Sequence, residues 1–405
     1  MSVRFVFEAI PRFRRCLPAA LTSLLCFFPT TGDAVGQGSH SFAETPLRHS
    51  AERIVSAFDV ADVAIDRVRR IYILQRQARQ IIVANAQGSH IRTIDLRPMQ
   101  PAEFAGPPQL GIYLNFIWVS HPLEGRITWL SDEGLLERVD VIRPSWRDSV
   151  GTGNELGGPL ADGLFYGTPS ILSPVLARGL VTRVPFLRIN RSGQVFDTLL
   201  WIGVSPHQTA VVKTVGNGPA SYLSQFIRDR ALVSISPSGD YVLVADRAPP
   251  EGPQPQEFIV RRVGILGDTV AQVNVRYVPV ATTEKYLDAL LASRRMEGRL
   301  FGGRVDEGEY RRAMWKPRYL PPLESLWAGI DGSIWMAMTT SDVFEQPERE
   351  WLVLSPSMNQ RFRVKLPKQL LIVQASLDEV WGILRDDRGV SHVYRYDLCP
   401  FEGER

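Results

Sequence analysis

The sequence predicts an all-β protein in which a short four-stranded unit repeats six times and closes into a ring. Three observations lead to this prediction: β-branched and aromatic residues recur in short runs, glycine (32) and proline (29) are frequent, and a strand–turn–strand pattern returns along the chain. The chain has 405 residues, of which 44% are hydrophobic and 22% charged. It is therefore long enough to bury a sizeable core.

The charge balance argues against a nucleic-acid partner. Lys and Arg number 46 and Asp and Glu 43, so the formal net charge is only +3. A protein that binds nucleic acid by neutralising phosphates needs a larger basic excess. We therefore expect no nucleic-acid partner. The ligand expected instead is a protein, peptide or glycan, and the chain is expected to be a monomer.

The N-terminal segment 1–34 has the three-part pattern of an export signal. Basic residues precede an apolar run from Leu17 to Phe28, and small and polar residues follow up to Ala34. The run is shorter than the ~20 residues of a membrane-spanning helix. We predict cleavage, an exported protein in the periplasm or outside the cell, and no transmembrane segment afterwards. An uncleaved anchoring helix is the alternative.

The cysteines agree with this division of the chain. Cys16 and Cys26 lie in the signal, so the mature chain keeps only Cys399 and has no internal disulfide. Lipidation at Cys26 is disfavoured because leucines precede it where bacterial lipoproteins have a small residue. We expect a flexible leader over 35–50, the ring over 51–398 and a tail over 399–405.

Six short strands carry a large aromatic residue near their start and mark the repeat. Successive anchors are 46, 47, 76, 94 and 46 residues apart. Three intervals match a four-stranded propeller blade of about 40 to 50 residues, so the two long ones must contain insertions. We expect the aromatics to pack between blades rather than to stack on a ligand. The anchors are Tyr72, Trp118, Phe165, Tyr241, Trp335 and Trp381.

The last repeat indicates how the ring closes. Turn residues with Gly or Asx separate the strands of each repeat, as in Asn85-Ala86-Gln87-Gly88. The sixth repeat has only three strands, over 370–376, 380–384 and 392–398. The apolar segment 52–58 can supply the fourth and so pair the open edge. The predicted fold is a six-bladed β-propeller closed by pairing of an N-terminal strand with the last blade.

Three segments carry a resemblance to a known fold family. They are 236–242 (SPSGDYV), 329–336 (GIDGSIWM) and 380–396, which begins VWGILRDD. Over residues 50–398 the chain resembles six-bladed β-propellers of the NHL-repeat and TolB-like kind, in particular exported bacterial ones. The third repeat departs from the pattern at 156–159 (LGGP). The resemblance implies the fold and says little about activity, because one fold hosts many functions.

Two insertions are expected to lie over the same rim of the ring, because both follow an outer strand. Thr283 to Arg295, between blades 4 and 5, has Tyr286, Leu287, Leu290 and Leu291 on one face and is predicted to be a helix. Segment 221–227 is predicted to be a second, shorter helix. The insertions form either a lid or partner-binding surface, or padding over a blade edge.

Polar residues in the connections between second and third strands are the candidate ligand-binding residues. These connections should ring one mouth of the central channel, where mixed charges can bind an anionic or polyhydroxylated ligand. The competing interpretation is that these residues are polar only because loop tips are exposed to solvent. The candidates are Arg76, His121, Glu124, Asp246, Arg247, Asp342, Arg385 and Asp387.

Enzyme signatures are not found in the sequence. It contains no Gly-x-Ser-x-Gly elbow, His-Glu-x-x-His, Walker loop or Cys-x-x-Cys pair. We therefore favour a non-catalytic binding module with its ligand at the channel mouth. The alternative is a metal-assisted lyase or hydrolase, with a divalent ion in the channel bound by His121 and nearby acids.

Overall fold

The computed structural model describes residues 44–99, 108–121, 124–142, 154–169, 183–203, 207, 209–212, 221–296, 307–342 and 344–400. The predicted signal 1–34 lies outside the described residues, as do 35–43 of the leader and 401–405 of the tail. The described residues all belong to one compact unit.

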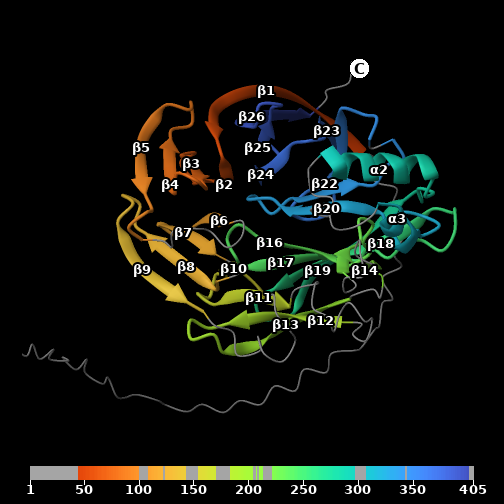
Figure 1. Cartoon of the computed structure of the whole chain (residues 1–405), viewed down its shortest axis with the longest axis horizontal. Helices are drawn as coiled ribbons and strands as arrows, with labels where there is room; N and C mark the ends of the chain where they lie inside the picture. The colour runs from red at the N-terminus through yellow and green to blue at the C-terminus, as the bar shows by residue number, and fades with distance from the viewer. Residues whose placement is uncertain are drawn as a thin grey trace, which may run out of the picture. The chain divides into compact units, whose positions relative to one another are not determined.

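Four separate antiparallel sheets of four strands follow the chain in order, and we call them repeats 1 to 4 (Figure 1). Repeat 1 contains β2 (Val60–Ile65), β3 (Ile71–Gln75), β4 (Gln80–Ala84) and β5 (His90–Asp95). Repeat 2 contains β6 (Gln109–Tyr113), β7 (Phe116–His121), β8 (Arg126–Leu130) and β9 (Leu136–Val141). Repeat 3 contains β10 (Asn154–Pro159), β11 (Phe165–Pro169), β12 (Arg183–Ile189) and β13 (Val195–Gly203). Repeat 4 contains β16 (Leu232–Ile235), β17 (Tyr241–Ala245), β18 (Gln256–Gly264) and β19 (Thr269–Tyr277).

The fifth and sixth repeats share one eight-stranded sheet in the order β20-β21-β22-β23-β1-β26-β25-β24. The prediction of six separate blades is therefore wrong, because a short parallel ladder joins the last two repeats at Glu44 to Pro46 of β1 and Arg361 to Arg363 of β23. Repeat 5 contains β20 (Leu323–Ala328), β21 (Ile334–Met338), β22 (Glu348–Leu354) and β23 (Arg361–Pro367). Repeat 6 contains β24 (Leu371–Ala375), β25 (Glu379–Arg385), β26 (Val390–Pro400) and β1 (Glu44–Phe58).

The predicted N-terminal closure is confirmed and is longer than expected. β1 pairs antiparallel with β26 from Leu47↔Pro400 to Phe58↔Val390. Residues 47–50, predicted as leader, and 399–400, predicted as tail, are thus part of this strand pair. The last sheet has no open edge at β26, because that strand lies between β1 and β25.

The core lies between repeats. Among the described residues, six buried apolar clusters each combine side chains of two consecutive repeats, including repeats 6 and 1. Each sheet therefore buries both faces against its neighbours, and burial of apolar area holds the sheets in sequence around a centre (Figure 1). The chain has a β-propeller-like all-β fold.

The aromatic anchors are packing residues. Tyr72, Phe165, Trp335 and Trp381 are at most 1% exposed. Trp118 also explains the irregular third repeat, because a methyl group at Gly111 or Gly158 would overlap its ring. Gly158 of β10 therefore makes room for an aromatic residue of repeat 2.

One end of the sheets, which we call the lower end, carries the turns between first and second strands. Neighbouring repeats are joined there by polar contacts, which run around the whole ring. They are Arg69–Glu379 (3.1 Å), Arg70–Asp132 (2.9 Å), Tyr113 Oη to Ala161 O (3.1 Å), Ala161 N to Gly239 O (3.0 Å), Arg262 Nη2 to Gly332 O (2.7 Å) and Ile330 N to Ala375 O (2.8 Å).

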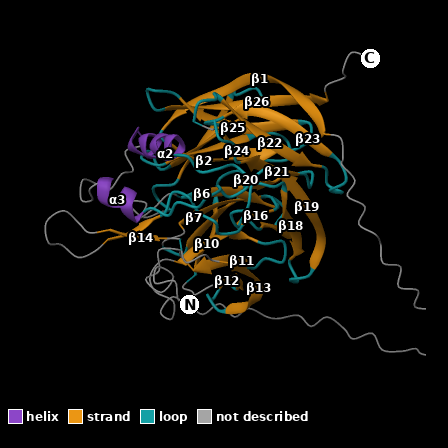
Figure 2. Ribbon diagram, turned by 90° about the vertical axis from the view of Figure 1, so that its right-hand side faces the viewer, coloured by secondary structure: helices purple, strands orange, loops and turns teal. Residues whose placement is uncertain are grey.

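The two insertions pack together at the opposite end, which we call the upper end (Figure 2). The predicted helix is confirmed as α2 (Glu284–Met296), whereas α3 (Glu307–Ala313) was not expected. Segment 221–227 is not a helix: β15 (Ser221–Ser224) forms a hairpin with β14 (Thr209–Val212). Gln225 ties the insertions together, since its amide donates to Ala313 O (3.1 Å) and accepts from Trp315 N (3.0 Å).

Candidate functional site

The upper end carries the connections between second and third strands and those between repeats. In each antiparallel sheet, the first-to-second and third-to-fourth turns lie at the lower end. The second-to-third connection and the link to the next repeat therefore lie at the opposite end. All eight predicted site residues lie at or beside such second-to-third connections, as the strand prediction requires. Their binding roles remain predictions. They are Arg76, His121, Glu124, Asp246, Arg247, Asp342, Arg385 and Asp387.

Two of the predicted arginines tie a repeat to the next. Arg385 Nη2 donates to Val60 O (3.4 Å), and Arg247 Nη1 donates to Leu323 O (3.0 Å). Val60 and Leu323 are both the first residue of a first strand, so the two contacts are equivalent. The Arg76 backbone N–H donates to Asp59 O (3.1 Å), next to Val60.

The predicted acids have mostly local roles. Asp246 forms an ion pair with Arg261 (3.3 Å), and the Asp342 carbonyl accepts two backbone N–H groups of its own turn. Glu124 N donates to His121 O (3.0 Å) in a tight turn, and Asp387 is exposed. These four residues therefore lie apart around the end rather than in one cluster.

His121 is buried at the end of β7, with 4% of its surface exposed. Burial, together with the nearby Arg126 cation, lowers its pKa to about 4. The imidazole is therefore neutral at physiological pH, and a neighbouring cation opposes a divalent ion there. Among the described residues, no group of three or more His, Cys, Asp and Glu is placed to hold a metal ion.

A cluster that the sequence analysis missed surrounds Arg247. Arg349 Nη2 lies 2.9 Å from Glu324 Oε2, and both side chains are about one-fifth exposed (21% and 22%). Arg247 reaches the same place through its bond to Leu323 O, and Lys368 lies close enough to act electrostatically on Glu324. We call Arg247, Glu324, Arg349 and Lys368 the cationic cluster.

The electrostatics of the cationic cluster favour an additional anion. Burial raises the pKa of Glu324 although three cations oppose it, and burial together with Arg349 lowers the pKa of Lys368. Burial and Arg228 lower the pKa of Arg247 to about 10. Three cations of the cluster thus face Glu324, while Arg228 and Asp229 add one charge of each sign beside Arg247. The buried Nε atoms of Arg247 and Arg349 also have no hydrogen-bond partner among the described residues.

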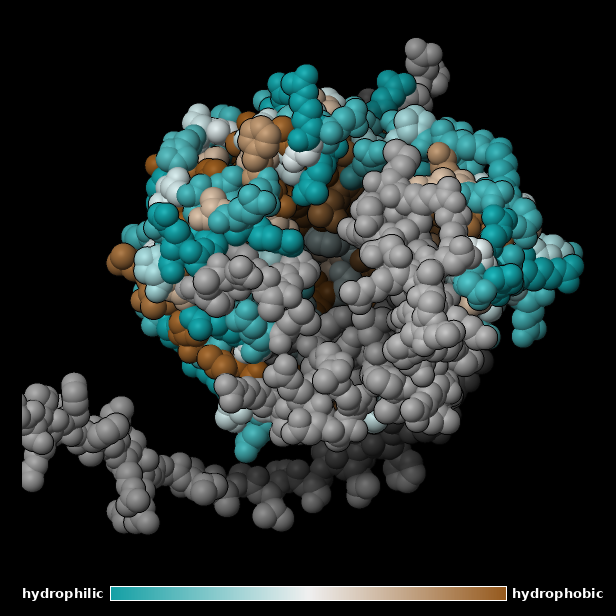
Figure 3. All heavy atoms as spheres, viewed as in Figure 1, coloured by the Kyte–Doolittle hydropathy of each residue, from teal (hydrophilic) through white to brown (hydrophobic). Residues whose placement is uncertain are grey.

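The helical insertion covers part of this cluster. Lys368 Nζ lies 4.6 Å from the Phe344 ring centroid, and Tyr286 of α2 packs on Phe344 at 5.2 Å. Lys285 of α2 pairs with Glu345 (2.5 Å) in the same connection. Figure 3 shows the upper end hollowed near its centre.

Acids in the first strands were the signal that sequence analysis did not use. Glu324 in β20 and Asp62 in β2 are the charged residues of two mainly apolar strands. Asp62 accepts Leu110 N of the next repeat (2.7 Å) and Val63 N (2.9 Å), while burial raises its pKa to about 6. Asp62 therefore joins two repeats, whereas Glu324 joins the cationic cluster.

The comparisons with known proteins find only distant structural similarity. No protein-family model matches the sequence, and no curated protein matches it significantly. Among solved structures, the PQQ-bound aldose sugar dehydrogenase of Streptomyces coelicolor is 11% identical, with a TM-score of 0.41 over 88% of this chain and 100% of that one. A Bacteroides fragilis protein described as a candidate exported protein is 11% identical, with a TM-score of 0.42 over 90% and 98%.

A Bacteroides vulgatus member of the DUF4221 family is 7% identical, with a TM-score of 0.40 over 88% of this chain and 100% of that one. Similarity at this level carries no argument about ligand or reaction. In the part of the chain that the structure describes, no helix is long and apolar enough to cross a membrane.

Proposed function

We propose that the protein is an exported, non-catalytic β-propeller that binds an acidic protein, peptide or glycan at its upper end. The observation that carries this proposal is the excess of positive charge at the cationic cluster. Arg247, Arg349 and Lys368 face Glu324, and Arg228 and Asp229 beside Arg247 add only one charge of each sign. An acidic group of a ligand can accept charge-assisted hydrogen bonds from partly exposed guanidinium and ammonium groups.

The location of the cluster supports recognition of a large ligand. Its residues come from four segments: the β17–β18 connection, the start of β20, the start of β22 and the β23–β24 connection. They lie beside α2 and Phe344, which offer additional contact surface. A site of this kind can contact both an acidic group and the neighbouring parts of a large ligand.

The architecture belongs to the same proposal. In our interpretation the two halves of the eight-stranded sheet act as the fifth and sixth blades, and β1 supplies the outer strand of the sixth. Segment 1–34 directs export and is removed, and the mature chain is a monomer. N-terminal sequencing of protein recovered from the periplasm or medium, and its mass in solution, test these two points.

Calorimetric titration with two acidic probes tests the binding function. The probes are an octaglutamate peptide and tetragalacturonate, each compared with its uncharged counterpart, octaglutamine and the tetragalacturonate methyl ester. We expect at least one acidic probe to bind and its neutral counterpart not to bind. Affinity should fall at high salt, because screening weakens exposed charge pairs.

Substitutions in the cationic cluster test whether the acidic probes bind there. Arg349→Gln or Lys368→Gln should weaken binding about tenfold through loss of one charge-assisted hydrogen bond. Arg388→Gln is the matched control, since Arg388 is exposed at the same end but outside the cluster. Absence of binding by both acidic probes, or an equal loss in the control, would contradict the proposal.

A further inference from the structure

A cavity of about 230 Å³ lies on the other side of the repeat 5 sheet from the cationic cluster. Adjacent residues of β22 face the two places: Arg349 pairs with Glu324, and Glu350 lines the cavity. The cavity is bounded by the end of β19, segments 278–280 and 320–322, and strands β21 to β23. It is therefore a separate site between repeats 4 and 5.

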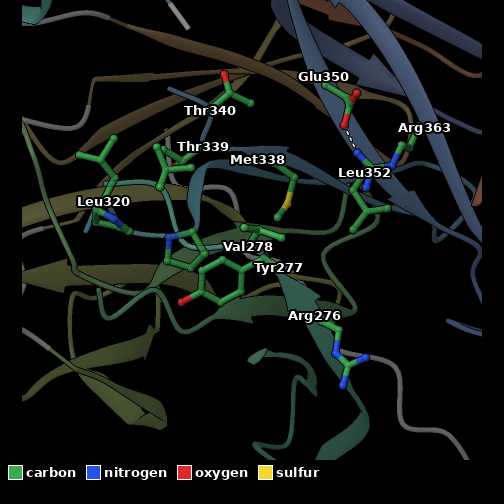
Figure 4. Close-up of a pocket in the computed structure, with 13 residues that line it drawn as sticks. Arg276, Tyr277, Val278, Leu320, Met338, Thr339, Thr340, Glu350, Leu352 and Arg363 are labelled. Atoms are coloured by element: carbon green, nitrogen blue, oxygen red, sulfur yellow. Dashed lines mark hydrogen bonds and ion pairs between the residues drawn. The ribbon is translucent and has the colours of Figure 1, made fainter. Parts of the chain in front are cut away.

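One part of the cavity wall is apolar. Tyr277 of β19, Leu320 and Leu352 are each less than 10% exposed, and Met338 lies between Tyr277 and the threonines that follow β21 (Figure 4). Two prolines, at 321 and 322, complete this wall. Proline rings and Tyr277 give it a stiff surface.

The other part of the wall is polar. Thr339 and Thr340 line the cavity at the end of β21, and neither side chain hydrogen-bonds to another described residue. Glu350 forms an ion pair with Arg363 of the next strand, and both side chains remain partly exposed. Figure 4 shows this pair and Thr340 on the far side of Met338 from Tyr277. The wall thus offers hydroxyls, a carboxylate and a guanidinium together.

We propose that this cavity binds one uncharged pyranose ring, as a free monosaccharide or the end of a glycan. A pyranose has a C–H face for the apolar wall and hydroxyls that both donate and accept hydrogen bonds for the polar one. The size agrees, because the cavity is smaller than the 300 Å³ or more of sites for drug-sized molecules.

Other ligand classes fit the walls less well. A purely apolar ligand would displace water from the threonine hydroxyls and from the Glu350–Arg363 pair. It could not offer hydrogen bonds in place of those that these groups make to water. A charged ligand would find Glu350 and Arg363 already neutralising each other. This inference goes beyond the proposed function, because it requires no acidic group and uses different residues.

Saturation-transfer NMR on the whole protein tests the proposal. The probes are glucose, galactose, mannose and N-acetylglucosamine, with cyclohexanol as the ring lacking most hydroxyls and galacturonate as the charged analogue. We expect at least one neutral sugar to give a saturable signal stronger than that of cyclohexanol or galacturonate. No neutral sugar binding at tens of millimolar, or an equal signal from cyclohexanol, would overturn the proposal.

Two variants place the sugar in the cavity. Thr340→Val keeps the side-chain shape and removes the hydroxyl, and should weaken binding about fivefold through one lost hydrogen bond. Val278→Trp should abolish binding, because Val278 lines the cavity but is 72% exposed, so a larger side chain can narrow the opening without disturbing the core.

Val270→Trp is the matched control on β19, the strand that ends directly before Val278, since Val270 is 59% exposed and does not line the cavity. Binding that survives Val278→Trp, or falls equally in the control, would overturn the assignment. The acidic-probe titrations are independent of these measurements, so either proposal can fail alone.

Discussion

The two ends of the ring use charge in opposite ways. At the lower end, Arg188 is 5% exposed and pairs with both Asp162 (2.8 Å) and Asp197, and Arg70 pairs with Asp66 (2.6 Å) and Asp132. These two cations are thus each matched by two carboxylates. At the upper end, the cationic cluster together with Arg228 and Asp229 has four cations for two carboxylates.

The paired charges of the lower end hold the ring together, whereas the charges of the cationic cluster remain available to a ligand. Neutralised pairs in tight turns stabilise the joins between repeats and leave little charge for a ligand. A surplus of cations costs folding free energy through mutual repulsion, which a bound anion would relieve. Substitutions at the lower end should therefore reduce stability, and those in the cluster should reduce binding.

The largest effect is expected at the seam between repeats 6 and 1, which the lower-end contacts close. Trp381 is fully buried there, so Trp381→Ala should lower the free energy of unfolding by about 3 to 5 kcal/mol. Urea denaturation measures this loss. Trp201→Ala is the control, because Trp201 is 58% exposed on β13, and similar losses in both variants would show that the seam is not tightly packed.

We expect His121 to be an exception to this comparison. It lies at the upper end, but it is buried and should therefore affect stability. Its pKa is lowered to about 4, so the folded protein binds a proton less readily than the unfolded chain does. Stability should fall as pH drops from about 6.5 toward 4, by up to about 3 kcal/mol.

Urea denaturation across this pH range, in the wild type and in His121→Gln, isolates the contribution. The variant should lack this part of the pH dependence, because glutamine does not titrate. Identical profiles for the two proteins would mean that His121 is accessible to protons in the folded state.

The smallest effects compare one arginine at each end. Arg188→Met leaves two carboxylates without their partner and should cost about 2 kcal/mol, less than for a fully buried pair because both carboxylates are partly exposed. Arg349→Gln should cost below about 1 kcal/mol, since Arg349 and Glu324 keep contact with solvent. Thermal unfolding ranks the two, and the reverse order would remove the distinction between the ends.

The strand order was predictable because local signals repeat. The Asn85 and Asn190 side chains each accept two backbone N–H groups of their own turns, which is what the Asx pattern predicts. The closing strand could be inferred from a strand missing in repeat 6. The turns can be recognised from short stretches of sequence, and the closing strand from counting the strands of each repeat.

The join between repeats 5 and 6 and the cationic cluster were not predictable in this way. The parallel ladder uses residues 44–46, where Thr45 and Pro46 give no strand pattern. The cluster unites side chains at 247, 324, 349 and 368, which only the packed fold brings together. Hydrogen bonds across long sequence separations leave no periodic trace.

The pairing of β1 with β26 has a consequence for biosynthesis. β1 emerges from the ribosome before almost all of the other strands, and its main partner β26 is nearly the last to be made. A nascent polypeptide therefore carries a 15-residue β1 without its main partner until synthesis is nearly complete. Premature termination before Val390 would leave β1 permanently without that partner and expose the product to proteases.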